Sequence, residues 1–356
     1  MDVTTPKYIL VENHIKQAIK KKQIVDKLPG ERTLASDLGF SYMTIRKAID
    51  NLVAEGVLYK IPTKGTFVAD KKSRKKNTRT IGYFLDASIQ AGISSPYYSL
   101  IFNAIEKEAA KHGYSVIYFS DIRENKLRKI LSRLDGVIAT CFPRIENIIQ
   151  DIKETIPVVV IDNAAADKTI PSVIIDNFNA DVESVDYICS LGHKRIGFMT
   201  GLEDSDVGKN RYAGYQNGLT KHQIDVDATL VFRGNYSFES GMEGAEYFMS
   251  LDHPPTAIIC ANDSMALGAI KRLHQAGIHV PEDISIVGFD DIDVASQINP
   301  ALTTVAAPIE EIANRSFMML DQLIQGLEPE NKHVALAAHL VIRQTCSKLV
   351  RSTAAA

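Results

Sequence analysis

The 356-residue chain contains no tryptophan, only four cysteines, and no apolar run near the ~18 residues that a membrane span requires. The cysteines, Cys141, Cys189, Cys260 and Cys346, are widely separated, in neither a metal-ligand spacing nor a dense disulfide pattern. The N-terminus has no hydrophobic segment followed by a small-residue cleavage site. We therefore expect a globular protein without a membrane segment, located in the cytoplasm, with its cysteines reduced.

The common catalytic and phosphate-binding motifs are also missing. The sequence has no G-x-G-x-x-G after a strand, no G-x-x-x-x-G-K-[ST], no H-E-x-x-H and no G-x-S-x-G. Asp290 and Asp291 are adjacent carboxylates, but neighbours on a strand point to opposite faces and need not share a site. The prediction is that the protein is not an enzyme and uses no cofactor and no metal.

Charge is distributed unevenly along the chain. Residues 1–79 hold 17 Lys and Arg against 8 Asp and Glu, a net charge of +9, whereas the remainder holds 23 against 35, a net charge of −12. A basic head on an acidic body is expected when one part of a protein meets a polyanion and the other does not.

The head has the pattern of a winged helix-turn-helix. Apolar residues spaced by three and four predict a first helix from Tyr8 to Ile19, a second helix over residues 31–38 closed by Gly39, and a third capped by Ser41. Residues 58–61 and 66–69 read as two strands around a turn rich in glycine and proline, which would form the wing. A helix placed in the major groove beside a basic hairpin is a DNA-reading arrangement.

The stretch LPGERTLASDLGFSYMTIRKAIDNLVAEGVLYKIPTKGTFVA resembles the DNA-binding domain of GntR-type regulators. The resemblance covers nearly all of residues 6–69. It implies DNA contacts from the second helix, the start of the third helix and the wing, by Arg32, Ser41, Tyr42, Met43, Thr44, Arg46, Lys64, Gly65 and Thr66.

Two features of this surface stay open at the sequence level. Tyr42 stands where most members of the family have arginine, and a tyrosine cannot grip guanine through two hydrogen bonds, so the operator is expected to differ from the usual one. Arg46 is one turn from Asp50 and the two could simply pair, while Arg32 could be a solvated helix residue.

Residues 70–79, in the run DKKSRKKNTRT, contain no apolar side chain and read as a flexible basic linker. The linker is either a solvated connector only or a source of additional phosphate contacts. Residues 351–356 read as an uninformative tail.

The body alternates short apolar runs with longer helical patterns, which predicts an α/β fold with parallel sheets. The rhythm restarts near residue 180, so two similar lobes are expected. Ligands of such sheets bind beyond the carboxyl ends of the strands, which places a ligand in the cleft between the lobes.

Residues 79–350 resemble the effector domain of LacI/GalR regulators, itself similar to periplasmic sugar-binding proteins. The resemblance rests on motifs such as SLGHKRIGFMTG, RYAGYQNGL, PTAIICANDSMALGAI and VPEDISIVGFDD. It implies a two-lobed domain over residues 80–350 that forms a homodimer. Lobe 1 would span about 80–175 and 304–327, and lobe 2 about 176–303 and 328–350. A GntR-type head on this body resembles the arabinose repressor group, which does not establish arabinose as the ligand.

This second resemblance implies effector contacts from Tyr97, Tyr98, Asp162, Arg211, Tyr236, Asn262 and Asp290. A guanidinium, an amide and a carboxylate can bind adjacent hydroxyls while an aromatic face covers a sugar ring. The alternative is structural: Arg211 and Asp290 form a buried ion pair, Asn262 caps its helix and the tyrosines are core. Asp263 and Asp291 are expected to be turn or capping residues.

The leading hypothesis is a transcriptional repressor that binds operator DNA as a homodimer and responds to a small polyhydroxylated effector, a sugar or a related molecule. The competing hypothesis is a ligand-binding protein whose basic head docks to an acidic protein.

Overall fold

The computed structural model describes residues 6–21, 23–54, 56–61, 65–68, 78–86, 89, 91–120, 124–140, 146–202 and 204–349. The chain divides into two compact units, a head, Met1–Thr78, and a body, Arg79–Ala356. Within these described ranges, no helix is long and apolar enough to cross a membrane.

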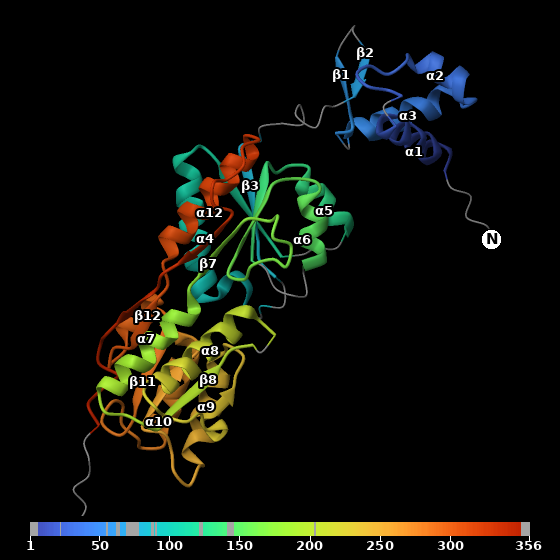
Figure 1. Cartoon of the computed structure of the whole chain (residues 1–356). Coiled ribbons are helices and arrows are strands. Elements are labelled where there is room, and N and C mark those ends of the chain that lie inside the picture. Colours follow the sequence, from blue (N-terminus) through green and yellow to red (C-terminus); the bar gives the residue numbers. More distant parts are fainter. Residues whose placement is uncertain are drawn as a thin grey trace, which may run out of the picture. The chain divides into compact units, whose positions relative to one another are not determined.

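The head has the predicted winged helix-turn-helix architecture (Figure 1). Its elements are α1 (Lys7–Lys20), α2 (Glu31–Leu38), α3 (Tyr42–Ala54), β1 (Leu58–Ile61) and β2 (Gly65–Val68). The apolar stripes of the helices and β1 meet in one small core, which contains Val11, Ile15, Leu28, Leu34, Ile45, Ala48, Ile49, Leu52 and Leu58. This core holds α3 against α1 and α2, so that the opposite face of α3 is exposed.

Local chemistry sets the turn between α2 and α3. Gly39 ends α2 in the left-handed conformation, with φ at 68°, which a glycine adopts without steric cost. The hydroxyl of Ser41 then accepts a hydrogen bond from the Thr44 amide at 3.2 Å and lies 2.8 Å from the Thr44 hydroxyl, so it caps the start of α3 as predicted.

The wing has one strand-like segment more than the sequence indicated. The Leu28 amide donates to the Thr66 carbonyl at 2.8 Å, and the Val68 amide donates to the Asp26 carbonyl at 2.7 Å. Residues 26–28 therefore lie along the free edge of β2. A segment of three residues is too short to show the alternation of apolar and polar residues that predicts a strand. Its place at this edge depends on the tertiary fold.

The body consists of two lobes, each with a six-stranded sheet between helices (Figure 1). In lobe 1 all strand pairs are parallel, in the order β13-β7-β6-β5-β3-β4. The strands are β3 (Thr80–Phe84), β4 (Ser115–Phe119), β5 (Gly136–Thr140), β6 (Val158–Ile161), β7 (Ser172–Ile175) and β13 (His333–Leu336). One face is covered by α4 (Pro96–Lys111) and α12 (Ile309–Ile324), the other by α5 (Glu124–Leu131) and α6 (Glu146–Lys153). A 3-10 helix, η1 (Gly92–Ser94), precedes α4.

Lobe 2 repeats this plan, in the order β14-β12-β11-β10-β8-β9, and only its edge strand β14 is antiparallel. The strands are β8 (Ile196–Thr200), β9 (Val231–Arg233), β10 (Ala257–Cys260), β11 (Ser285–Asp290), β12 (Thr303–Ala306) and β14 (His339–Val341). Its helices are α7 (Asn177–Ser190), α8 (Asp206–Lys221), α9 (Phe238–Met249), α10 (Asp263–Gln275) and the short α11 (Asp293–Gln297), with a 3-10 turn η3 (Ala228–Leu230).

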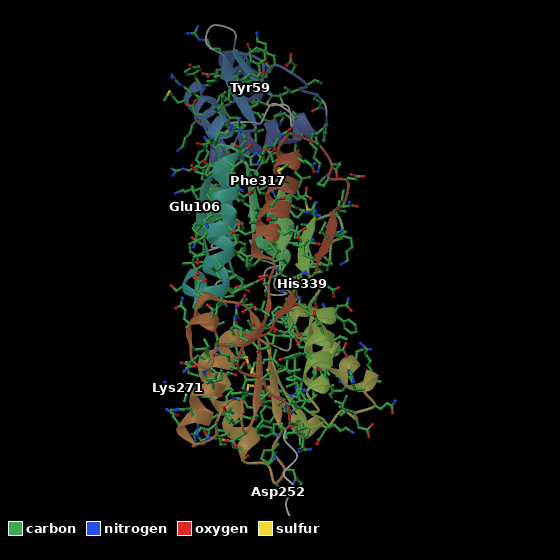
Figure 2. All side chains as sticks on the ribbon, turned by 90° about the vertical axis from the view of Figure 1, so that its left-hand side faces the viewer. Tyr59, Glu106, Asp252, Lys271, Phe317 and His339 are labelled. Carbon is green, nitrogen blue, oxygen red and sulfur yellow. The ribbon has the colours of Figure 1, made fainter. Side chains whose placement is uncertain are left out.

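Side chains alternate between two cores across each sheet. In β10, Ala257 and Ile259 pack under α7 and α8, whereas Ile258 and Cys260 pack under α9 and α10. This period of two is the reason that the strands of the body are apolar throughout. Figure 2 shows Glu106 and Lys271 pointing outward from the body, while Phe317 of α12 lies inside lobe 1, fully buried.

The chain passes between the lobes three times, after β7, after β12 and after β13. The lobe boundaries expected from the sequence are wrong in two places. Strand β12 pairs with β11 in lobe 2, although residues 304–306 were expected in lobe 1, and β13 pairs with β7 in lobe 1, although residues 328–350 were expected in lobe 2. A short strand is assigned to a sheet by pairing with strands distant in the sequence, so the local pattern carries no information on the lobe.

Candidate functional site

A cavity of about 420 Å³ lies between the two lobes of the body. It opens where strands β6, β9, β10 and β11 end, the edge at which parallel sheets bind ligands. The structure brings all seven residues predicted for effector binding to its wall: Tyr97, Tyr98, Asp162, Arg211, Tyr236, Asn262 and Asp290. Lobe 1 supplies Tyr97, Tyr98 and Asp162, and lobe 2 supplies the other four.

Arg211 of α8 is buried and has several partners within the protein. Its Nε donates to Oδ1 of Asn177 at 2.8 Å, and its Nη1 donates to the carbonyl of Ala261. Nη2 lies 3.9 Å from Oδ1 of Asp290, and the guanidinium carbon is 3.4 Å from the centroid of the Phe289 ring. The buried ion pair is therefore present, but it is long, and these contacts orient the guanidinium on the cavity wall.

Each lobe supplies one carboxyl group to this cavity, Asp162 from lobe 1 and Asp290 from lobe 2. Burial raises the pKa of Asp290 well above its usual range, although Arg211 opposes this shift. Burial also raises the pKa of Asp162, against the hydrogen bond that its Oδ1 accepts from the Tyr97 hydroxyl at 2.9 Å. The other oxygen of Asp162, Oδ2, is buried and has no hydrogen-bond partner among the described residues. An orphan acceptor of this kind is costly unless a ligand or a water donates to it.

Asn262 and Tyr236 meet at the lobe 2 side of the cavity. Asn262 caps α10, since its Oδ1 accepts from the Met265 amide at 2.9 Å, and its Nδ2 donates to the Tyr236 carbonyl at 3.0 Å. The capping role that the sequence left open is thus real, and it coexists with a place on the cavity wall. The Tyr236 hydroxyl is buried without a partner among the described residues, and a Cβ at Gly201 would overlap its ring.

Three of the seven cavity residues have positive backbone φ angles: Asp162 at 67°, Tyr236 at 68° and Asp290 at 116°. Such angles are rare for residues with a side chain and cost of order 1–3 kcal/mol each. Strain of this kind collects where a side chain must be aimed at a ligand. No sequence pattern announces it at these positions.

The sequence reasoning missed several wall residues. Asn177 begins α7 directly after the crossover from β7, donates to the Ile175 carbonyl at 3.1 Å and holds Arg211 through its Oδ1. The polar residues Ser205 and Asn235 follow β8 and β9 and also line the cavity. The signal that could have found them is their position just beyond strand ends: Asn177 follows β7, Ser205 follows β8 and Asn235 follows β9.

Asp263 and Asp291 do not line the cavity. Asp263 accepts hydrogen bonds from the Thr304 hydroxyl at 2.5 Å and from the Ile292 amide at 2.9 Å, so it ties β12 to the turn after β11. Asp291 pairs with Arg343 at 2.7 Å. Both aspartates thus have partners within the protein.

The outer face of α3 and the start of α2 carry most of the residues predicted to contact DNA. Arg32, Ser41, Tyr42, Met43 and Arg46 are exposed, and Thr44 is half-buried. Met43 is 68% exposed and Tyr42 is 40% exposed, so both side chains are accessible on the surface of the head.

The proposed pairing of Arg46 with Asp50 is not what the structure shows. Asp50 instead lies 2.8 Å from Nζ of Lys60, which also reaches Glu31 at 3.2 Å. Across the part of the head that the structure describes, no ion pair involves Arg46. Its side chain is exposed, and within those residues no carboxylate holds its guanidinium.

The three wing residues differ. Gly65 is exposed and has φ at 117°, a conformation that favours glycine. Thr66 is only 9% exposed, so its side chain is buried, and a DNA contact from this residue stays a prediction. Lys64 lies outside the described residues.

Within the described ranges, no group of three or more His, Cys, Asp or Glu side chains is placed to hold a metal ion.

Two family models match the chain. Residues 7–68 match the bacterial regulatory proteins of the gntR family, and residues 185–346 match the periplasmic binding protein-like domain. The chain is 34% identical over 259 residues to the HTH-type transcriptional repressor CytR of Escherichia coli (strain K12), covering 70% of this chain and 76% of the relative. It is 32% identical over 281 residues to the probable HTH-type transcriptional repressor ExuR of Bacillus subtilis (strain 168), covering 78% and 84%.

A solved structure agrees with the fold. The putative transcriptional regulator LacI from Bacillus cereus subsp. cytotoxis NVH 391-98 matches with a TM-score of 0.69 and 28% identity, over 76% of this chain and 99% of that one.

Proposed function

We propose, from the premise that the chain belongs to the LacI-family transcriptional regulators and carries a GntR-type DNA-binding domain, that α3 reads operator DNA while the cavity between the lobes binds a polyhydroxylated effector. The chain is a DNA-binding transcriptional regulator with a small-molecule effector, and it is not an enzyme. The residues that contact DNA and effector, the polyhydroxylated class of the effector and the homodimer are what we propose.

The observation that carries the effector proposal is the set of incompletely bonded polar groups on the cavity wall. Oδ2 of Asp162 and the hydroxyl of Tyr236 are both buried and unpartnered among the described residues, and they come from different lobes. A ligand rich in hydroxyls donates to a carboxylate and pairs with a phenol at the same time. The aromatic rings of Tyr97 and Tyr98 would cover an apolar ring face of that ligand.

Such a ligand would join the lobes, because groups from both contact it. Effector binding would then favour the closed arrangement of the body and change the operator affinity by its differential affinity for the two states. We propose that the chain acts as a homodimer on two half-sites, in the cytoplasm, as a repressor that its effector releases.

The experiment is a thermal-shift screen of the full chain against neutral sugars, sugar phosphates, nucleosides and purines, because a ligand that binds the folded state raises its melting temperature. A hit must lose its effect in Tyr236→Phe, which removes only an unpartnered hydroxyl, and must keep it in Tyr187→Phe, a half-buried tyrosine of α7 away from the cavity. A hit that raises the melting temperature of both variants equally would place the ligand elsewhere.

DNA binding by the head is tested by measuring operator affinity at several salt concentrations and on several DNA sequences. Operator affinity that falls steeply with salt and depends on sequence supports DNA reading by the head. Binding without sequence preference would favour the competing role of the basic head in docking to an acidic partner.

A further inference from the structure

The first turn of α3 exposes two large apolar side chains. Met43 is 68% exposed and Tyr42 is 40% exposed, whereas Ile45, Ile49 and Leu52 on the same helix are fully buried. At about 100° per residue, Met43 lies almost opposite the centre of this buried stripe. Met43 therefore has no role in the core of the head.

The cations near Met43 are not equivalent. Lys47 lies over the ring of Tyr8, with Nζ 4.3 Å from its centroid, and Lys60 is held by Asp50 at 2.8 Å. Arg46 has no ion pair in the part of the head that the structure describes. The outer face of α3 thus offers one thioether and one guanidinium side by side, three residues apart.

Elementary chemistry limits what this pair can read. A methionine side chain has no hydrogen-bond donor, so it cannot select guanine or adenine by their acceptors. The apolar group that B-DNA presents in its major groove is the C5 methyl of thymine. A flexible, polarizable thioether fits such a small methyl group well. Tyr42, beside Met43, adds apolar ring surface and cannot grip guanine through two hydrogen bonds.

We propose that Met43, supported by Tyr42, determines specificity for the C5 methyl of a thymine in each operator half-site, next to the position that Arg46 contacts. The proposal rests on the DNA-reading function of α3. It names the base chemistry that this function recognises.

The test begins with selection of binding sites from random duplex DNA by the full chain, with no assumption about the operator. Each thymine of the selected half-site is then replaced by deoxyuridine, which removes the methyl group and nothing else. Loss of one buried methyl is worth about 0.8 kcal/mol, so one position should lose about fourfold in affinity. Met43→Ala should weaken binding to the thymine operator and abolish the difference between thymine and deoxyuridine at that position.

Leu10→Ala is the matched control, since Leu10 of α1 is a 48% exposed apolar residue of the same head. It should leave the thymine preference unchanged. The salt dependence of binding should also stay the same in Met43→Ala, because no phosphate contact is lost.

Three outcomes decide the matter. A fourfold deoxyuridine effect that vanishes in Met43→Ala supports the proposal. A selected site at which no deoxyuridine weakens binding, or an effect that persists in Met43→Ala, overturns it and leaves the DNA-reading function intact. Failure to enrich any sequence would overturn that function itself, and the inference with it.

Discussion

The head carries its candidate functional side chains on its surface, whereas the body buries them around a cavity. In the head, Tyr42, Met43 and Arg46 lie outside a small apolar core and are exposed. In the body, Arg211 and Asp290 lie inside, with side chains only 5% and 8% exposed. An exposed surface can be read from helix periodicity, whereas a buried polar cluster depends on which strand ends the fold brings together.

The two regions also differ in the free-energy cost of their functional side chains. The head loses little by exposing a charge or a thioether to water, but the body holds polar groups that are buried and incompletely bonded. Substitutions in the body should therefore change stability strongly, while those on the surface of the head should mainly change DNA affinity.

The largest effect is expected for Arg211→Ala. This change leaves the acceptor oxygens of Asn177 and Ala261 without their buried donor and removes the cation beside Asp290, so we expect a loss of about 3–5 kcal/mol in the free energy of unfolding. Denaturant unfolding measures it. Below its melting temperature the variant should lose the effector response and keep operator affinity.

Lys209→Ala is the control for this change, because Lys209 lies on the same helix with its side chain 60% exposed. It should alter neither stability nor effector response. Loss of operator binding by folded Arg211→Ala protein would contradict the assignment of Arg211 to effector binding.

The second effect concerns pH. Both oxygens of Asp181 on α7 are buried without a partner among the described residues, and burial raises the pKa of this carboxyl to about 7. The unfolded chain loses this proton near pH 4, so stability should fall as pH rises from 4 to 7, by up to about 4 kcal/mol from this group.

Asp181→Asn should flatten that part of the stability profile and make the protein more stable at pH 8 than the unchanged chain. Urea unfolding at pH 5 and pH 8 measures the difference. The exposed Glu183→Gln on the same helix should leave the profile as it is. Equal pH dependence in the Asp181→Asn variant would show that Asp181 does not titrate in this range.

A smaller effect, about 1–3 kcal/mol of operator affinity, is expected for Arg46→Gln. The guanidinium has no ion pair within the described part of the head, so its loss should weaken DNA binding and leave the stability and the effector response unchanged. Lys20→Gln removes the same charge from an exposed position at the end of α1 and should have little effect. Equal losses of operator affinity in both variants would show that Arg46 acts only through the net charge of the head.

The smallest effect is expected for Ser41→Ala, which removes the cap of α3 and should cost about 1 kcal/mol of head stability. Hydrogen exchange of the α3 amides in the full chain measures it. Ser41→Asn keeps a capping side chain and should restore protection. Unchanged exchange in Ser41→Ala would show that the hydroxyl contributes nothing to the helix.

The sequence by itself determined the elements whose causes are local. The periodicity of α1 and α3, the left-handed Gly39, the cap at Ser41 and the two-lobed α/β rhythm follow from neighbours a few residues apart, and the structure has them. The resemblance to known families then pointed to seven residues that the fold brings to one cavity.

The tertiary structure alone decided the rest. Strand β13 joins lobe 1 because it pairs with β7, about 160 residues away in the chain, and residues 26–28 join the wing because they reach the edge of β2. The orphan carboxylate oxygen of Asp162, the strained backbone of Tyr236 and the partner that Asn177 provides for Arg211 are also long-range results. Hydrogen bonds between distant segments, and the burial of polar groups that goes with them, depend on the whole fold and leave no local pattern in the chain.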